Sequence, residues 1–118
     1  MTQRYALVTA GAQGLGRALV LHLVQQHYSL CIHYHRSHQE ALALQTDILA
    51  AGGEAFCVQA DLHQAAERER LMAEVSARLP ALHVLVNNLG WYFIDRLPQI
   101  TLEQWEQALA LNCKIGRA

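Results

Sequence analysis

The chain has 118 residues, of which 53% are hydrophobic, and its formal net charge at pH 7 is -1. This length fits a single domain over residues 1–118 with a buried core, and the near-neutral charge gives no electrostatic basis for binding nucleic acid or an anionic membrane surface. We find no signal-like segment and no apolar run of the ~18 residues that a membrane span needs, so we expect a cytoplasmic protein.

A predicted strand over residues 5–8 is followed by a glycine-rich turn and the start of a helix. Gly11, Gly14 and Gly16 leave this turn without side chains, so an anion can approach the free N–H groups at the positive end of the helix dipole. The apolar residues of the helix recur at i, i+3, i+4 spacing, which favours a phosphate-binding turn over the alternative of a tight structural turn. The helix residues with this spacing are Leu15, Ala18, Leu19, His22 and Leu23.

The remainder of the chain alternates strands and helices. Short β-prone runs cover residues 29–34, 55–59 and 83–88. Helices are predicted from about residue 38 to 51, between Asp61 and Pro80, and from a capping box at 101–104 to about residue 112. Strands that alternate with helices need right-handed crossovers. We therefore predict an α/β fold of the doubly wound Rossmann type, a three-layer αβα arrangement around a parallel sheet of strand order 3-2-1-4, truncated after the fourth βα unit.

In such a sheet, a ligand lies at the carboxyl ends of the strands, beside the switch point between the first and fourth strands. The second strand ends in Tyr34-His35-Arg36-Ser37, which holds no carboxylate for a ribose 2′-hydroxyl. Arg36 and the Ser37 hydroxyl instead offer donors to a 2′-phosphate. This run favours NADP(H) over NAD(H), and the alternative is a solvated loop arginine.

Polar side chains also follow the third and fourth strands. Asp61 either accepts a hydrogen bond from an adenine amino group or caps the next helix. Asn87, Asn88 and Gly90 close the fourth strand, beside the position expected for a nicotinamide ribose. Together, these strand ends predict a site that binds a whole dinucleotide.

Three histidines and a cysteine near the second strand raise the hypothesis of a metal site. His33, His35, His38 and Cys31 match no zinc-ligand spacing, and Cys31 alternates with the first two histidines along a strand. We therefore predict no metal. The three cysteines of the chain are odd in number and widely spaced, and we interpret them as reduced thiols.

These motifs resemble those of the short-chain dehydrogenase/reductase family over nearly the whole chain. The run from Thr9 to Gly16 resembles its TGxxxGxG turn, Asp61-Leu62 its adenine-side acid, and Asn87-Asn88-Leu89-Gly90 its NNAG segment. The run from His33 to Ser37 is similar to the NADPH-binding segment of pteridine reductases. The resemblance implies hydride transfer between NADP(H) and a small-molecule carbonyl, alcohol or pterin-type substrate, with cofactor contacts from Gly11, Gln13, Gly14, Leu15, Gly16, Tyr34, His35, Arg36, Ser37, Asp61, Leu62, Asn88, Leu89 and Gly90.

The chain departs from the family's motifs at three positions. Ala10 stands where the family has its first motif glycine, which is tolerable if φ stays negative there. Leu89 replaces an alanine beside the cofactor. Pteridine reductases usually carry an arginine at the position of Gly14, where it helps to hold the pterin, so a pterin is one candidate among several carbonyl or imine substrates.

The resemblance gives one catalytic residue within the chain. Asn112 matches the helix asparagine of the family's Asn-Ser-Tyr-Lys tetrad, which supports a water in the proton relay, and the alternative is a simple helix-end asparagine. The family's serine, tyrosine and lysine follow the point where this chain stops, and no tyrosine here has YxxxK spacing. We therefore expect a truncated or frameshifted cofactor-binding portion that is inactive alone. A homo-oligomer is possible for a full-length form only, so none is inferred for this chain.

Two other function classes are alternatives to an oxidoreductase. The first is a non-catalytic dinucleotide-binding or partner-binding protein that uses the exposed edge of the fourth strand. The second is a flavodoxin-like or receiver-type signalling domain. The sequence lacks the acidic cluster after the first strand that a receiver needs, which argues against that version.

Overall fold

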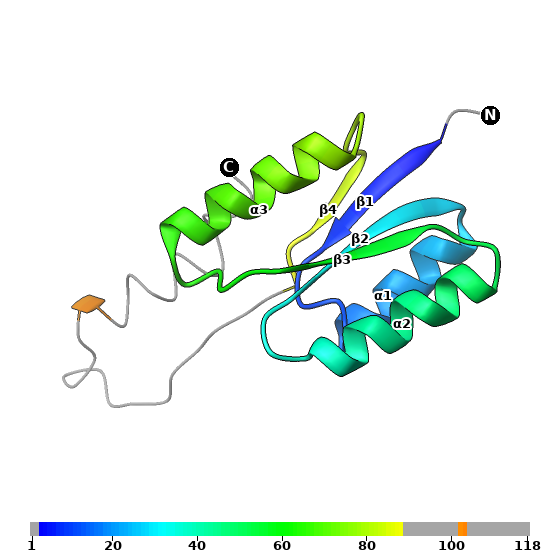
Figure 1. Ribbon diagram of the computed structural model, residues 1–118, viewed down its shortest axis with the longest axis horizontal. Coiled ribbons are helices and arrows are strands. Elements are labelled where there is room, and N and C mark those ends of the chain that lie inside the picture. The colour runs from blue at the N-terminus through cyan, green and yellow to red at the C-terminus, as the bar shows by residue number, and fades with distance from the viewer. Residues whose placement is uncertain (1–2, 89–101, 104–118) are drawn as a thin grey trace.

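The computed structural model describes residues 3–88 and 102–103, and within them four strands alternate with three helices (Figure 1). The third strand has the predicted bounds, and the second begins one residue earlier than predicted. Among the described residues, no helix combines the length and the apolar content that a membrane span needs. The elements in chain order are β1 (Arg4–Val8), α1 (Gly14–Gln25), β2 (Tyr28–Tyr34), α2 (His38–Ala50), β3 (Ala55–Gln59), α3 (Ala65–Arg78) and β4 (Val84–Val86).

All three strand pairings are parallel, and the strand order is β3-β2-β1-β4, which confirms the predicted order. The central strand β1 is in register with both neighbours, since Ala6 lies opposite Leu30 of β2 and Val84 of β4. The carboxyl ends of the four strands therefore meet at one edge of the sheet. The reversal of strand order between β1 and β4 places a switch point at that edge.

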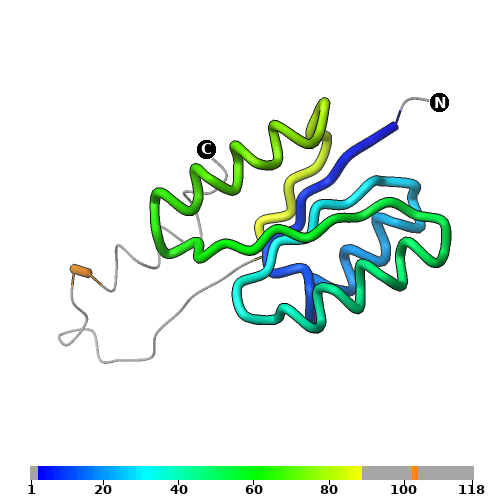
Figure 2. Tube along the Cα trace, viewed as in Figure 1, coloured from blue at the N-terminus to red at the C-terminus, as the bar shows by residue number. Residues whose placement is uncertain are grey.

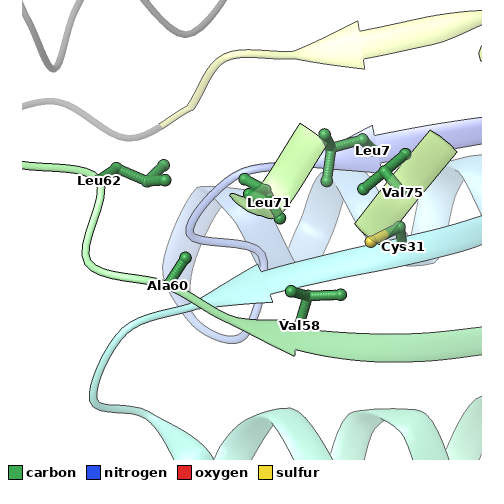
Figure 3. Packing of buried hydrophobic residues seen from close by; sticks show 7 residues of the cluster. All are labelled: Leu7, Cys31, Val58, Ala60, Leu62, Leu71 and Val75. Carbon is green, nitrogen blue, oxygen red and sulfur yellow. The ribbon is translucent and has the colours of Figure 1, made fainter. Parts of the chain in front are cut away.

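Alternate residues of the strands face opposite helix layers, which gives the predicted three-layer arrangement. One face carries Ala6, Val8, Leu30 and Ile32, and α1 and α2 cover it side by side (Figure 2). The other face is covered by α3 (Figure 3). The buried cluster under α3 consists of Leu7, Cys31, Val58, Ala60, Leu62, Leu71 and Val75.

The apolar residues that recur along α1 only partly coincide with its buried face. Leu15, Ala18 and His22 are exposed and Leu23 packs partly against the core, whereas Gly16 and Val20 are buried. Gly16 has no side chain, so the helix approaches the preceding turn closely on that side. The buried i, i+4 pair of α1 is therefore Gly16 and Val20, and a hydrophobic pattern does not identify a glycine as a buried position.

The fourth strand is shorter than predicted, because only Val84–Val86 pair with β1. His83 precedes the strand, and its Nδ1 accepts a hydrogen bond from the Tyr5 N–H at 3.0 Å. Of the predicted helix over 101–112, residues 102–103 are helical and the rest lie outside the described residues.

Candidate functional site

A cavity of about 460 Å³ opens at the carboxyl edge of the sheet, between the turn after β1 and the turn after β2. Gly14 is the first residue of α1 and Ser37 is the N-cap of α2, so two helix N-termini border the same space. The lining brings together seven of the predicted contact residues: Gln13, Gly14, Tyr34, His35, Arg36, Ser37 and Asn88. It also includes Ala10, Ala12 and His33, which were not predicted to bind the cofactor.

The three glycines of the first turn have different environments. Gly14 has φ of +56° and no atom near the position of a side chain, so it is open toward the cavity. A Cβ on Gly11 would lie 3.1 Å from Val20 Cγ2, and a Cβ on Gly16 would overlap the Ala10 carbonyl oxygen. Gly11 and Gly16 therefore allow close packing within the turn, and the cavity lining contains neither of them, nor Leu15, which is 68% exposed.

Ala10 adopts the left-handed region, with φ of +51°. The condition of a negative φ at this position is therefore not met. A Cβ in this region costs about 1–2 kcal/mol. Hydrogen bonds on both sides of Ala10 hold it there: its N–H donates to His33 Nδ1 at 3.0 Å, and its carbonyl accepts from Asn88 Nδ2 at 3.2 Å.

Replacing Ala10 with glycine is expected to stabilise the folded chain by about 0.5–1 kcal/mol. Removing the Cβ relieves its steric strain in the left-handed conformation, and this gain outweighs the greater conformational freedom of glycine in the unfolded chain. The midpoint of urea unfolding measures the change. Ala12→Gly is the matched control, since Ala12 is buried in the same turn without a positive φ, and it should be destabilising. A lower midpoint for Ala10→Gly would contradict the strain assigned to Ala10.

The end of β4 is tied to the end of β1 by Thr9 and Asn88. The Thr9 N–H donates to the Val86 carbonyl at 3.1 Å, and Thr9 Oγ1 accepts from the Asn88 N–H at 2.9 Å. Asn88 lines the cavity, and its side-chain amide also bonds to the turn. The predicted neighbours Leu89 and Gly90, and the catalytic candidate Asn112, lie outside the described residues.

The turn after β2 presents donors that other protein groups do not use. Arg36 is exposed and has no hydrogen-bond or ion-pair partner among residues 3–88 and 102–103. Ser37 is the N-cap of α2, yet its hydroxyl makes no capping hydrogen bond. The turn itself is fixed, since Tyr34 Oη lies 2.8 Å from His38 Nδ1 and Gln59 Nε2 donates to the His35 carbonyl at 3.2 Å.

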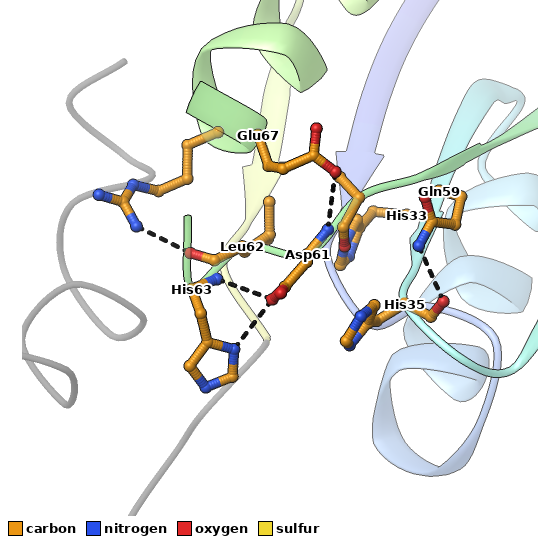
Figure 4. Close-up of polar contacts among 9 residues, drawn as sticks. His33, His35, Gln59, Asp61, Leu62, His63 and Glu67 are labelled. Atoms are coloured by element: carbon orange, nitrogen blue, oxygen red, sulfur yellow. Dashed lines mark hydrogen bonds and ion pairs between the residues drawn. The ribbon is translucent and has the colours of Figure 1, made fainter. Parts of the chain in front are cut away.

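Asp61 lies in the turn between β3 and α3 (Figure 4). It does not line the cavity. Its Oδ1 accepts from the His63 N–H and lies near His63 Nδ1, each at 3.1 Å. Desolvation opposes ionisation of Asp61, but these contacts outweigh it and hold the pKa of its carboxyl below the usual value. The carboxylate therefore caps this turn, while Gln64 is the N-cap residue of α3. Leu62 is buried under α3, also outside the cavity lining.

The histidines and cysteines near β2 do not gather as metal ligands. The described part of the chain holds no group of three histidine, cysteine or carboxylate side chains that is placed to bind a metal ion. Burial raises the pKa of the Cys31 thiol to about 12, with the Arg78 charge opposing, so Cys31 stays protonated. Cys31 and Cys57 are both free thiols, and Cys113 lies outside the described residues.

His33 lines the cavity, although it was not among the predicted contact residues. In the sequence it belonged to the run that resembles an NADPH-binding segment and was otherwise considered as a metal ligand, whereas both of its ring nitrogens bond to backbone groups beside the cavity. A histidine inside an otherwise apolar strand is the signal that marks it, because a buried polar side chain needs a partner on each polar atom.

Comparison with known proteins gives the same assignment as the motifs. The family model described as short chain dehydrogenase matches residues 4–114. A 3-oxoacyl-[acyl-carrier-protein] reductase, FabG, of Staphylococcus aureus is 32% identical over 109 residues, which are 92% of this chain and 44% of the relative. A 3-oxoacyl-[acyl-carrier-protein] reductase of Synechocystis is 34% identical over 112 residues, 95% of this chain and 45% of the relative.

Solved structures of this fold include proteins with bound NADP(H). FolM alternative dihydrofolate reductase 1 from Brucella canis, complexed with NADP, is 32% identical with a TM-score of 0.85 over 95% of this chain and 45% of that chain. A blue fluorescent protein from a metagenomic library, in complex with NADPH, is 28% identical with a TM-score of 0.87 over 95% of this chain and 46% of that chain. The chain thus spans less than half the length of these relatives. It belongs to the short-chain dehydrogenase family of oxidoreductases.

Proposed function

We propose that the chain binds NADP(H) as the dinucleotide-binding portion of a reductase that transfers hydride between this cofactor and a carbonyl, alcohol or pterin-type substrate. The observation that carries the proposal is the lining of the cavity. Among the described residues, this lining contains the ends of two helices and Arg36 but no carboxylate. Helix N-termini and an arginine both favour anions, and a dinucleotide with a 2′-phosphate has anions at two places.

The residues present fit the parts of such a cofactor. The pyrophosphate would bind at the N-terminus of α1, because the first N–H groups of this helix have no intrahelical partner. Gly14 leaves room for it, since no atom lies within 4 Å of the position of its Cβ. Arg36, the Ser37 hydroxyl and the N-terminus of α2 would hold the 2′-phosphate. Bound NADPH would supply the hydride, and the chain's own residues would orient the dinucleotide along the carboxyl edge of the sheet.

Two relatives with bound NADP(H) support the choice of cofactor. The relatives include both a 3-oxoacyl-[acyl-carrier-protein] reductase and an alternative dihydrofolate reductase. We therefore propose only a broad substrate class for this chain. We propose that the 118-residue chain binds the cofactor without turning over a substrate. None of its tyrosines is followed four residues later by a lysine, and general acid catalysis contributes about 10²–10⁴-fold to rate.

Titration of the chain with NADPH and NADH by calorimetry tests the cofactor assignment. We expect tighter binding of NADPH, and we expect Arg36→Ala to weaken NADPH binding about 10- to 100-fold while leaving NADH binding nearly unchanged, because charge-assisted hydrogen bonds contribute about 1.5–3 kcal/mol. Arg4→Ala is the matched control. It also removes one positive charge, but Arg4 is the first residue of β1 and so lies at the edge of the sheet opposite the cavity. Equal affinity for the two dinucleotides, or an Arg36→Ala variant that binds NADPH normally, would overturn the assignment.

A second candidate function follows from the edge of the sheet. Among the described residues, β4 pairs with β1 on one side and with no strand on the other, and its three residues are only partly buried. An unpaired strand edge can bind an extended segment of another chain. Failure of both dinucleotides to bind would favour this partner-binding function.

A further inference from the structure

His33 is a buried polar residue beside the proposed phosphate site. It is the last but one residue of β2, its side chain is 1% exposed, and it contributes to the cavity lining. Its Nδ1 accepts a hydrogen bond from the Ala10 N–H at 3.0 Å, and its Nε2 lies 2.9 Å from the Ala60 carbonyl oxygen. Because Nδ1 faces a donor and Nε2 faces an acceptor, the ring is neutral and carries its proton on Nε2.

The imidazole joins three segments that border the site. It connects β2 to Ala10 in the turn before α1 and to Ala60 after β3. The His33 backbone adds a further bond, since its carbonyl accepts from the Gly11 N–H at 3.0 Å. Ala10 has the left-handed backbone conformation that alanine disfavours, so this part of the turn depends on the bonds that hold it.

We propose that neutral His33 is a positioning residue that holds the phosphate-binding turn in shape, and that its protonation opens the turn and lowers the affinity for the dinucleotide. This inference rests on the proposed NADP(H) function. A protonated imidazole carries a hydrogen on each nitrogen, so Nδ1 could no longer accept the hydrogen bond from the Ala10 N–H and would place a second donor against it. The bond would be lost and the turn would relax from its strained conformation.

The surroundings of His33 determine the pH at which this happens. Burial lowers its pKa, the Ala60 carbonyl opposes that effect, and the nearby His35 lowers the pKa further. From the segment after β3, Asp61 is the adjacent charged group, and the turn before α1 presents Ala10, which does not titrate. The folded pKa therefore lies below the value of about 6.5 for a free imidazole, and the stabilising contacts are complete above that pH and lost as pH falls toward the folded pKa.

Titration of the chain with NADP⁺ at several pH values, alongside His33→Asn, tests the proposal. Asparagine has an acceptor near the position of Nδ1 but does not titrate. At about pH 8 the two proteins should bind within about threefold of each other. From about pH 7.5 to about pH 5.5 the original chain should lose more affinity than the variant, by up to the roughly tenfold that an imidazole of pKa about 6.5 would give, with the extra loss falling below that pH. The 2′-phosphate also titrates near pH 6, but the comparison at equal pH cancels its effect. His22→Asn, on the exposed side of α1, should follow the original chain.

Amide hydrogen exchange, compared with His33→Asn at each pH, separates positioning from a merely structural role. We expect the Ala10 amide to lose protection at low pH while the Leu7 amide in β1 stays protected. Parallel pH profiles for the two proteins, or loss of protection across β1 together with the turn, would overturn the proposal. Absence of NADP⁺ binding at about pH 8 would instead reject the proposed function, and the exchange of Ala10 would still report on the turn.

Discussion

Gly16→Ala is expected to destabilise the folded chain by about 3 kcal/mol or more, a large part of the 5–15 kcal/mol that is typical for a domain. The added Cβ would overlap the carbonyl oxygen of Ala10, and it would lie 2.7 Å from Asn88 Nδ2 and 2.9 Å from the Gly11 Cα. Two of these three neighbours are backbone atoms of the turn, so relief requires α1 to move away from the sheet. That movement would also disrupt the wall of the proposed pyrophosphate site.

Urea unfolding followed by circular dichroism measures the effect, with Gly14→Ala as the matched control. A Cβ on Gly14 meets no atom within 4 Å, and the cost there arises only from φ of +56°, which amounts to about 1–2 kcal/mol. A Gly16→Ala variant that is as stable as Gly14→Ala would show that α1 can move away from the turn at little cost.

The second large effect is expected for Leu7→Ala, at about 3–4 kcal/mol. Leu7 is fully buried in the central strand, where it packs with Cys31 and Val58 under α3. Its removal would leave a cavity between the sheet and the helix, and the rigid strands on both sides limit how far that cavity can collapse.

Leu49→Ala is the control for Leu7→Ala. Leu49 lies on α2 and is 50% exposed, so its truncation should cost less than about 1 kcal/mol. The difference in unfolding midpoint between the two variants measures how much burial contributes at β1. Equal midpoints would mean that the cluster under α3 is loosely packed.

The sequence predicted the sheet well because each strand is short, apolar and separated from the next by a helix. The strand order and the bounds of β3 are confirmed. The buried face of α1 does not follow from its apolar residues alone, because Gly16 is buried and contributes no hydrophobicity to the pattern. The φ of Ala10 could not be predicted either, since it is imposed by bonds to His33 and Asn88, which lie far away in the sequence.

The site shows the same division between local and distant determinants. Tyr34, His35, Arg36 and Ser37 follow one another in the sequence, and the structure places all four around the cavity. The contact of Asp61 is also local, since its carboxylate bonds to His63 two residues further on, at the start of the segment that leads into α3. The roles of Leu89, Gly90 and Asn112 remain predictions from the family resemblance.

The bond between Thr9 and Asn88 has a consequence for the order of folding. The two residues are 79 positions apart, whereas β1 and β2 pair across only 24 positions from Arg4 to Tyr28. Contacts between distant segments form late, because the chain must first lose the entropy of the intervening loop. The three-stranded sheet of β1, β2 and β3 can therefore assemble during synthesis, and the cavity at the carboxyl edge acquires its last wall when β4 emerges and docks. A chain still on the ribosome before this step would have its glycine turn but no closed place for a ligand.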